Sequence, residues 1–356
     1  MKWCLPLLAM VLLSGQVRAE ERYEFYNGVR ALGMGGAGVA VVNDETSLLV
    51  NPAGLGKLRD YFITIVDPEI EANSKLQTVA GLDVHKMNDP QTALDKLNQH
   101  TGDRIHERVQ MFPSIVVPNF GFGIYGKYEV NSEVNTTTNL FEYDYTNDYA
   151  MAMGFNLRLF NGIIKIGAAG RAINRTEVRR TDIDPTSTTL SLKTLASSGL
   201  GVAGDAGIII SAPIRYLPTI AAVYRDIGRT TYTLRDGMFL KTDTDPTSTP
   251  ETVDVAMAIF PIMGKRWRST FTVEYRDVLT VSDETDQMRR THGGIEFNYA
   301  DAFFLRGGYH QRYWTAGFEL AIINYQIQVA SYGEEIGTKD APEEDRRYVA
   351  KFAFRF

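Results

Sequence analysis

Cysteine is almost absent from this sequence of 356 residues, which contains one, Cys4. A single cysteine excludes a fold that is held together by disulfides. Long hydrophobic runs are missing as well. After the first 19 residues the longest runs cover about ten residues, as at 255–264, whereas a membrane-spanning helix needs about 20. The sequence therefore predicts no transmembrane helix.

Positive charge is not in excess, because 37 lysines and arginines stand against 43 aspartates and glutamates, for a net charge of −6. This balance argues against a nucleic-acid partner. The histidines show no metal-ligand spacing and no obvious nucleophile partner, so we expect no metal, no cofactor and no enzymatic activity. The five are His85, His100, His106, His292 and His310. A lone histidine in a loop is expected to be solvated.

The first 19 residues have the features of a secretory signal peptide. A charged start precedes an apolar run at 4–13, and the small residue Ala19 comes before the polar Glu20. Cleavage after Ala19 would leave a mature chain without cysteine. This exported chain has 18 tyrosines, 18 phenylalanines and 31 glycines in short alternating segments. That pattern favours a transmembrane β-barrel, with a soluble secreted β-domain as the alternative.

Alternation of side chains is clearest in the last ten residues. One face would carry Tyr348, Ala350, Phe352, Phe354 and Phe356, and the other would carry Arg347, Val349, Lys351, Ala353 and Arg355. In a soluble sheet the apolar face meets a core. In an outer-membrane barrel that face meets lipid and the charged face lines the lumen. The alternation predicts a strand in either environment.

The links between the predicted strands favour the barrel. Alternation is visible in fourteen segments: 61–72, 108–117, 121–135, 139–159, 163–180, 197–211, 219–234, 252–262, 269–280, 291–298, 303–310, 314–321, 325–332 and 347–356. Short links alternate with mostly longer polar ones, as in bacterial barrels with short periplasmic turns and long outer loops. We therefore predict an all-β chain, with a signal peptide at 1–19, an N-terminal segment at 20–58 and a transmembrane antiparallel barrel of about 14 strands at 59–356.

Two further patterns concern the interior and the outer end of this barrel. Arg158, Arg171, Arg225 and Arg306 fall on the non-lipid face of their strands. They are candidate lumen cations for a carboxylate ligand, although each would more simply pair with acidic residues of the lumen. The segment 88–102 begins with Asn-Asp-Pro and ends with Gly, which predicts a short helix in the first long loop. We expect this helix to act as an outer lid.

A glycine-rich stretch at 28–44 precedes the first strand. Gly33, Gly35 and Gly38 formally match the dinucleotide-binding fingerprint, but that fingerprint requires a βαβ unit, which a chain of antiparallel strands does not offer. Glycine and alanine instead allow tight packing inside a crowded lumen. The Asn-Pro-Ala-Gly motif at 51–54 predicts a firm turn just before the wall begins.

The stretch 28–55, the strands after it and the terminal Phe356 together resemble the FadL-type superfamily of outer-membrane transporters, which includes the PorV-like barrels of Bacteroidetes secretion systems. The resemblance implies a fourteen-stranded barrel that is closed by an N-terminal hatch inside the lumen. The residues assigned to the hatch are Gly33, Gly35, Gly36, Asn51, Pro52 and Ala53. It also implies that substrate leaves sideways near the third strand. The glycines of that strand, which either kink it or make room for the hatch, are Gly121, Gly123 and Gly126.

The resemblance implies one of two functions. The first is passive transport of a hydrophobic small molecule, such as a long-chain fatty acid, across the bacterial outer membrane, and it demands an apolar pocket between hatch and outer loops. The second is a structural or secretion-accessory barrel, for which a secreted protein would be the partner. In both cases outer-membrane lipid surrounds the barrel. The outer-membrane assembly machinery would read the terminal aromatics Phe352, Phe354 and Phe356.

Overall fold

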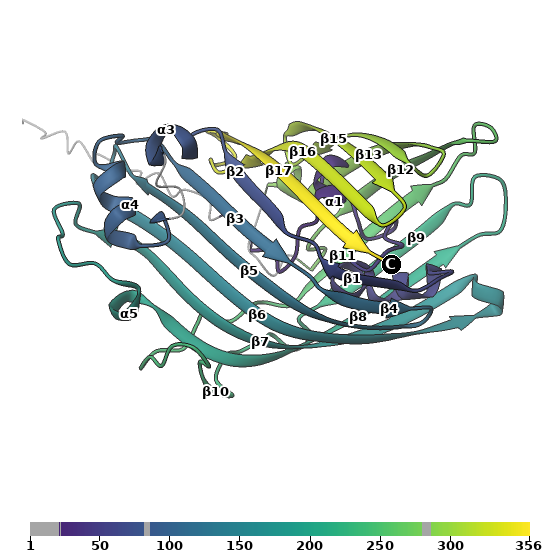
Figure 1. Ribbon diagram of the computed structural model, residues 1–356, viewed down its shortest axis with the longest axis horizontal. Coiled ribbons are helices and arrows are strands. Elements are labelled where there is room, and N and C mark those ends of the chain that lie inside the picture. Colours follow the sequence, from purple (N-terminus) through teal and green to yellow (C-terminus); the bar gives the residue numbers. More distant parts are fainter. Residues whose placement is uncertain (1–20, 22, 82–85, 280–285) are drawn as a thin grey trace, which may run out of the picture.

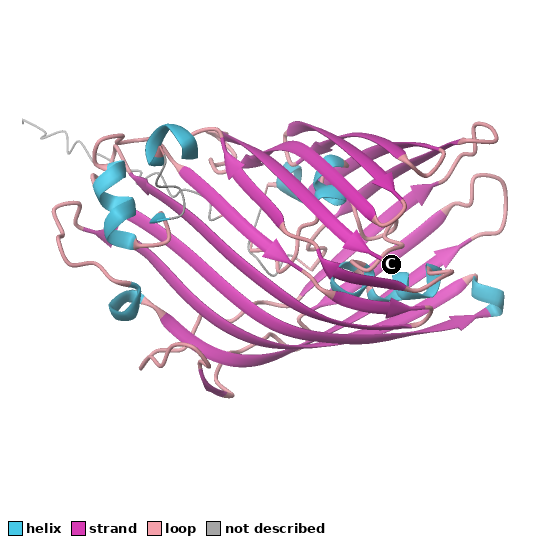
Figure 2. Ribbon diagram, in the orientation of Figure 1, coloured by secondary structure: helices cyan, strands magenta, loops and turns pink. Residues whose placement is uncertain are grey.

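A closed antiparallel barrel of fourteen wall strands makes up most of the molecule in the computed structural model (Figure 1, Figure 2). The structure describes residues 21, 23–81, 86–279 and 286–356, so the signal peptide predicted at 1–19 and His85 lie outside the described residues. Two wall strands consist of two segments each: β1 (Phe62–Val66) with β2 (Glu69–Asn73), and β3 (Ile105–Met111) with β4 (Ser114–Val117). The others are β5 (Phe120–Val134), β6 (Phe141–Leu159), β7 (Ile164–Ile183), β8 (Ser197–Ser211), β9 (Thr219–Arg225), β11 (Thr252–Ile259), β12 (Trp267–Tyr275), β13 (Thr291–Tyr299), β14 (Phe303–His310), β15 (Tyr313–Ile322), β16 (Tyr325–Glu335) and β17 (Glu344–Arg355). β17 closes the ring by pairing with β1 and β2.

The helices are short. The N-terminal segment contains α1 (Val29–Gly33), α2 (Ser47–Val50) and the 3-10 helix η1 (Pro52–Lys57). The long loops contain α3 (Leu76–Ala80), α4 (Pro90–Leu97), α5 (Leu192–Leu195) and α6 (Gln287–Arg290), and η3 (Phe160–Gly162) forms a tight turn at the opposite end. The described residues include no helix with the length and apolar character needed to cross a membrane. We call the end with the long loops the outer end.

The strand predictions are confirmed in number and, for most strands, in position. β8 and β14 have the predicted bounds. The strand predicted at 219–234 ends instead at Arg225, because Asp226 has a left-handed φ of 50° and turns the chain out of the strand. β12 likewise ends at Tyr275 rather than at residue 280, two residues before Asp277, whose φ is also 50°.

The side chains of each wall strand alternate between lipid and lumen. The outward residues in the lower part of β6 are Tyr149, Met151, Met153, Phe155, Leu157 and Leu159, each about half exposed. Asp148, the residue before Tyr149, points into the lumen and is fully buried. In β17 Phe352 is 43% exposed whereas Lys351 is 5% exposed, which confirms the two faces expected from the sequence. The alternation is enforced because a charged side chain facing lipid at the membrane midplane costs about 2–4 kcal/mol.

The wall is taller on one side than on the other (Figure 1). β6 and β7 have 19 and 20 residues, whereas β9 and β11 have 7 and 8. The tall strands therefore project past the membrane, which about 9–11 strand residues suffice to cross. The projecting ends of β5 and β6 carry apolar side chains such as Val130 and Tyr143 on the outward face, and these need cover from water.

α4 supplies that cover, and its expected role as a lid over the lumen is wrong. The helix itself is confirmed, with the Asp89 carboxylate accepting the Thr92 N–H at 2.9 Å as its N-cap. Its buried Leu94 joins Val130 and Tyr143 in one hydrophobic cluster. In β5, Val130 shares the outward face with the half-exposed Ile124, so α4 packs against the outside of the wall rather than across its mouth.

Phe356 joins the last strand to the first. Its N–H donates to the Ile63 carbonyl and its carbonyl accepts from the Ile63 N–H, both at 2.9 Å. We expect deletion of Phe356 to lower the amount of folded protein in the outer membrane, because it removes two closing hydrogen bonds and the terminal aromatic ring. Heat-modifiable, protease-resistant barrel in membrane fractions measures the effect. The control Phe356→Tyr keeps the ring and should assemble normally, and normal levels after the deletion would contradict the prediction.

Candidate functional site

The N-terminal segment, residues 23–58, lies inside the barrel between two groups of wall strands. α1 contacts β14 to β17, and η1 contacts β6, β7 and β8. Figure 1 shows the purple helix α1 behind β16 and β17. Nearly all residues from 28 to 56 are buried or half-buried. The segment thus occupies the lumen, and its movement as a hatch stays a prediction.

Glycine packs against glycine where the segment meets β13, β14 and β15. Gly35 and Gly36 have φ values of +68° and +84°, which favour glycine. The opposing wall also lacks side chains at this point: a Cβ added to Gly308 would lie 2.5 Å from the Gly35 nitrogen, and one added to Gly317 would lie 3.1 Å from the Gly33 Cα. The tight packing expected from the glycine-rich stretch is explained by this contact, which we call the first docking site.

Side chains of the wall hold the backbone of this turn. Thr315 Oγ1 accepts from the Gly35 N–H and donates to the Gly33 carbonyl, both at 3.0 Å. His292 Nδ1 and His310 Nδ1 lie 2.9 and 3.2 Å from the Gly35 carbonyl oxygen. Both histidines are at most 2% exposed and lie in β13 and β14, as the predicted strands 291–298 and 303–310 imply, so they are not loop histidines. The expectation of solvated loop histidines is wrong for His106, which lies in β3 and is fully buried. The sequence did not predict the contact with Gly35, because this partner is more than 250 residues away.

Asn51, Pro52 and Ala53 form a second docking site on β6, β7 and β8. Asn51 Oδ1 accepts from the Ala53 N–H at 3.0 Å and Asn51 Nδ2 donates to the Val39 carbonyl at 3.1 Å, which makes the turn that the sequence predicted. The wall again offers glycine: a side chain at Gly167 would collide with Pro52 and Ala53, and one at Gly207 with Asn51. The segment is therefore wedged between two glycine-lined walls.

The glycines of the third wall strand serve packing in the described state. A Cβ on Gly121 would lie 3.3 Å from Leu55 of the segment, and one on Gly123 would lie 2.5 Å from the Phe112 ring. Gly126 has only Tyr149 and Met111 near it, at 3.8–4.0 Å. β5 pairs with β6 over all fifteen of its residues without a register shift. On its other edge the pairing passes from β3 to β4, and Gly126 and Gly123 lie on either side of this break. A sideways exit at these glycines stays a prediction.

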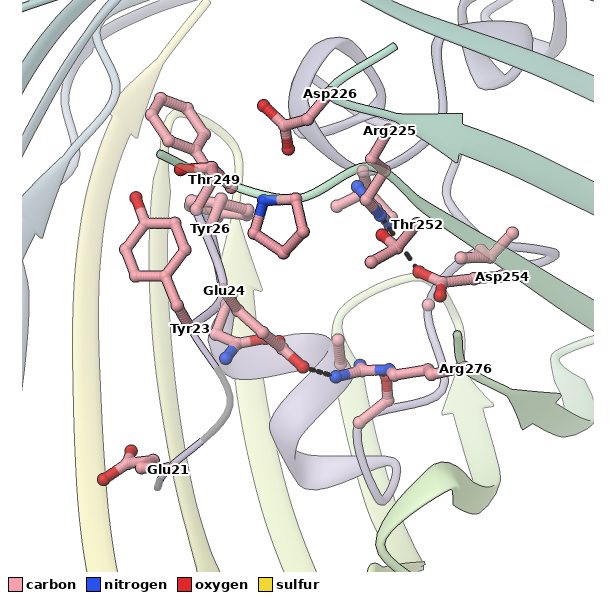
Figure 3. Close-up of a pocket in the computed structure, with 18 of the residues that line it drawn as sticks. Glu21, Tyr23, Glu24, Tyr26, Arg225, Asp226, Thr249, Thr252, Asp254 and Arg276 are labelled. Carbon is pink, nitrogen blue, oxygen red and sulfur yellow. Dashed lines mark hydrogen bonds and ion pairs between the residues drawn. The ribbon is translucent and has the colours of Figure 1, made fainter. Parts of the chain in front are cut away.

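A cavity of about 360 Å³ lies between the N-terminal segment and the outer end (Figure 3). Its lining joins apolar residues, among them Val39 and Val50, to many charged ones, whereas the expected pocket was apolar. Its arginines are Arg171, Arg175, Arg179, Arg225, Arg276, Arg289 and Arg290. Its carboxylates are Glu21, Glu24, Asp226, Asp254 and Glu274, and its aromatic residues are Tyr23, Phe25 and Tyr26. The cavity is therefore a charged site with an aromatic wall, because inward positions of these strands carry charge rather than apolar groups.

The arginines of β7 are stacked as well as paired. Arg175 binds Asp148 through two hydrogen bonds of 2.8 and 2.9 Å, and its guanidinium lies 4.3 Å from the ring centre of Tyr23 and 4.5 Å from that of Tyr232. This is the geometry of a cation–π contact on both faces. Arg171 has a similar arrangement, with the Phe25 ring at 4.3 Å. The N-terminal segment thus places aromatic rings on the arginines of the wall.

Two of the four candidate lumen cations line the cavity. Arg171 pairs with Asp205 at 2.8 Å, and Arg225 pairs with Asp254 at 3.0 Å (Figure 3). Arg306 lies next to α1, where it pairs with Glu296 at 2.7 Å. Arg171, Arg225 and Arg306 thus each pair with an acidic residue of the lumen, as the simpler expectation had it.

Arg158 is exposed at the end opposite the outer loops and donates to the Leu58 carbonyl at 2.8 Å. Sequence reasoning also missed Arg175, although it has the inward parity of Arg171 in the same strand. Arg276, whose inward position the alternation predicts, was not among the four candidate cations, and Glu24 binds it across the cavity (Figure 3).

Lys57, at the end of η1, has an altered pKa. Its Nζ donates to the Ala40 carbonyl at 3.0 Å and lies 5.3 Å from the centre of the Phe260 ring. Burial, reinforced by the charges of Arg30 and Lys165, lowers the pKa of Lys57 to about 7. At neutral pH this side chain is therefore protonated only in part, which reduces the cost of enclosing it in the lumen.

No family model matches the sequence, and no curated protein matches it either. Solved structures do resemble it. The CymD monoaromatic hydrocarbon channel is 9% identical, with a TM-score of 0.55 over 92% of this chain and 96% of that one. The toluene transporter TbuX of Ralstonia pickettii is 15% identical, with a TM-score of 0.53 over 92% and 98%. The toluene transporter TodX of Pseudomonas putida is 13% identical, with a TM-score of 0.53 over 94% and 98%. The chain therefore has the fold of the FadL-type outer-membrane barrels, as its resemblance to them predicted.

Proposed function

We propose that this protein lies in the bacterial outer membrane and lets a hydrophobic small molecule cross it passively through the lumen. The continuous lipid-facing row of β6 supports the membrane location. Three barrels of the same fold are described as channels or transporters for toluene and other monoaromatic hydrocarbons, which supports transport of this kind. The observation that carries the proposal is the enclosed cavity between the N-terminal segment and the outer end.

The charges of the cavity favour a substrate that carries a carboxylate. The seven arginines of the cavity outnumber its five carboxylates, although Arg171 and Arg225 are each paired. A neutral hydrocarbon would gain nothing from this excess of positive charge, whereas a carboxylate makes strong, short hydrogen bonds to guanidinium groups. The aromatic Phe25 and Tyr26 and the aliphatic Val39 and Val50 also line the cavity and would contact a hydrocarbon chain. A long-chain fatty acid joins both parts in one molecule, and we propose it as the substrate.

Passage through the lumen requires the N-terminal segment to move. We propose that it is a hatch, held closed by the first docking site around Gly35 and by the second around Pro52. The two sites lie on separate groups of wall strands. Release of one site would leave the segment attached at the other, so the hatch could open without leaving the barrel.

Uptake of labelled dodecanoate, compared with labelled toluene, tests the substrate. Cells with the protein should take up dodecanoate faster than cells without it. Arg225→Gln should slow uptake at limiting concentration by roughly tenfold or more, because the lost charge-assisted hydrogen bond is worth about 1.5–3 kcal/mol. Arg158→Gln is the matched control, since Arg158 lies outside the cavity, and it should leave uptake unchanged.

Two results would contradict the proposal. A gain in toluene uptake alone would reject the fatty acid while keeping hydrophobic transport. Equal uptake of both compounds with and without the protein, together with loss of a secreted or surface-attached protein in the deletion strain, would reject transport in favour of a secretion-accessory barrel.

A further inference from the structure

The segment that links β9 to β11, residues 226–251, takes an unusual course around the edge of β8, and we call it the strap. Its first part runs along the lumen side: Tyr232 is 1% exposed and sits where a side chain on the inward-facing Gly199 or Gly201 would be. The next residues lie in the plane of the wall, where the Leu234 N–H donates to the Leu200 carbonyl at 3.0 Å and β10 (Arg235–Asp236) pairs with β8.

The strap then crosses to the outside of the barrel. The Met238 N–H donates to Asn174 Oδ1 at 2.7 Å, and the Phe239 ring lies 5.0 Å from the ring of Tyr149. Asn174 and Tyr149 both have outward parity, since Arg175 and Asp148 next to them point into the lumen. Residues 237–240, which we call the outer limb, therefore lie on the lipid-facing side of β6, β7 and β8.

Tyr149 fixes the height of the outer limb relative to the membrane. It is the uppermost residue of the lipid-facing row that runs down β6 to Leu159, and eleven residues match the length that crosses a bilayer. Aromatic residues at the ends of such rows lie at the membrane interface. Above Tyr149, the outward-facing Tyr143 and Tyr145 belong to the cluster covered by α4. Phe239 thus meets the wall at the outer border of the membrane.

The outer limb presents two large apolar side chains away from the protein. Met238 and Phe239 are 72% and 69% exposed. We propose that these two side chains insert among the acyl chains of the outer leaflet, so that the strap is anchored in the membrane from outside the barrel. The exposed Arg235 and Asp236 precede the outer limb and would lie at the level of the headgroups. The surface is continuous with the lipid-facing row of β6. The backbone N–H groups of Leu234 and Met238 are already bonded to the wall, as an apolar surrounding requires.

Anchoring connects the leaflet to the cavity through one short stretch of chain. Tyr232, on the lumen side of the strap, shares a hydrogen bond of 2.9 Å with Thr249, which lines the cavity. Arg175 also donates to Thr249 Oγ1 at 3.1 Å. The membrane would therefore hold the strap from one side while the cavity arginine holds it from the other. This inference does not depend on which compound is transported.

Site-directed spin labelling tests the insertion, because the mature chain starting at Glu20 has no cysteine of its own. Single cysteines at Met238 and Phe239 would carry a nitroxide in the full barrel, reconstituted in phosphatidylcholine vesicles. Collision with oxygen, which concentrates in the acyl region, is compared with collision with a water-soluble nickel chelate. Met153→Cys is the lipid-facing control and Asp243→Cys, exposed in the same strap, is the aqueous control.

The outer-limb labels should show an oxygen-to-nickel ratio that matches Met153→Cys and exceeds Asp243→Cys. All three apolar positions are exposed, so the substitutions leave the fold intact, which heat-modifiable migration checks for each variant. Ratios at Met238 and Phe239 equal to that at Asp243 would overturn the proposal, since they would place the outer limb in water.

Discussion

A barrel that lacks residues 30–51 is expected to pass ions as an open pore, whereas the whole chain should pass little current. The deletion removes the buried α1 turn and α2, which fill the lumen between the two docking sites. No wall strand is touched, so the ring still closes between β1 and β17. Single-channel recording in planar bilayers measures the change, which should be the largest among the variants considered. The arginines of the cavity should make the open pore prefer anions.

A deletion of residues 88–101 is the matched control. It removes α4, a short helix that lies against the outside of the wall. This deletion should not raise the conductance, although it exposes the outward Val130 and Tyr143 and should lower stability. If the 30–51 deletion does not raise the conductance, in a barrel shown to be folded by heat-modifiable migration, the segment does not block the lumen.

Gly308→Val is expected to give the second largest effect, by displacing the first docking site. A Cβ at position 308 would lie 2.5 Å from the Gly35 nitrogen and 2.5 Å from the Gly293 carbonyl oxygen of β13. The new side chain therefore presses on the N-terminal segment and on the neighbouring strand, so heat-modifiable migration must show that the barrel is folded. Overpacking of this kind costs about 1–3 kcal/mol, enough to shift a segment that other contacts still hold. We expect intermittent openings of the pore, smaller or briefer than those of the 30–51 deletion.

Gly204→Val provides the control for Gly308→Val. A Cβ at Gly204 would meet nothing within 4 Å, and the residue has outward parity next to the half-exposed Val202. The substitution adds the same side chain to the wall without touching the N-terminal segment, so the pore should stay closed. Equal behaviour of the two variants would show that the segment is not seated on Gly308.

The wall was predictable from sequence because membrane strands repeat one rule at every second residue. Lipid tolerates Met153 and Phe155 but not Asp148, and that rule needs no knowledge of partners. It failed at β9, where apolar residues continue in the strap beyond Asp226 and suggest a longer strand. There the chain leaves the wall for reasons of backbone conformation that hydrophobicity does not record.

The site was much less predictable, since its parts are far apart in the chain. The glycine-rich stretch predicted tight packing, but it did not indicate that Gly308 and Gly317 form the opposing surface. Periodicity likewise predicted the helix of α4, yet a helix of this length has an apolar side whether it covers a pore or a wall. The charged cavity combines residues of β7, β9, β12 and α6 with Tyr23, and only the closed ring brings them together.

The wedging of the N-terminal segment has a consequence for the order of assembly. This segment is made first, yet Gly33 finds its partner Thr315 only after 282 further residues. η1 leads within a few residues into β1, which forms one side of the closing seam with β17. The wall strands must therefore assemble around the N-terminal segment. The second docking site, on β6 to β8, is available to it well before the first, on β13 to β15. The seam between β1 and β17 would then close around an N-terminal segment that is already bound at the second docking site.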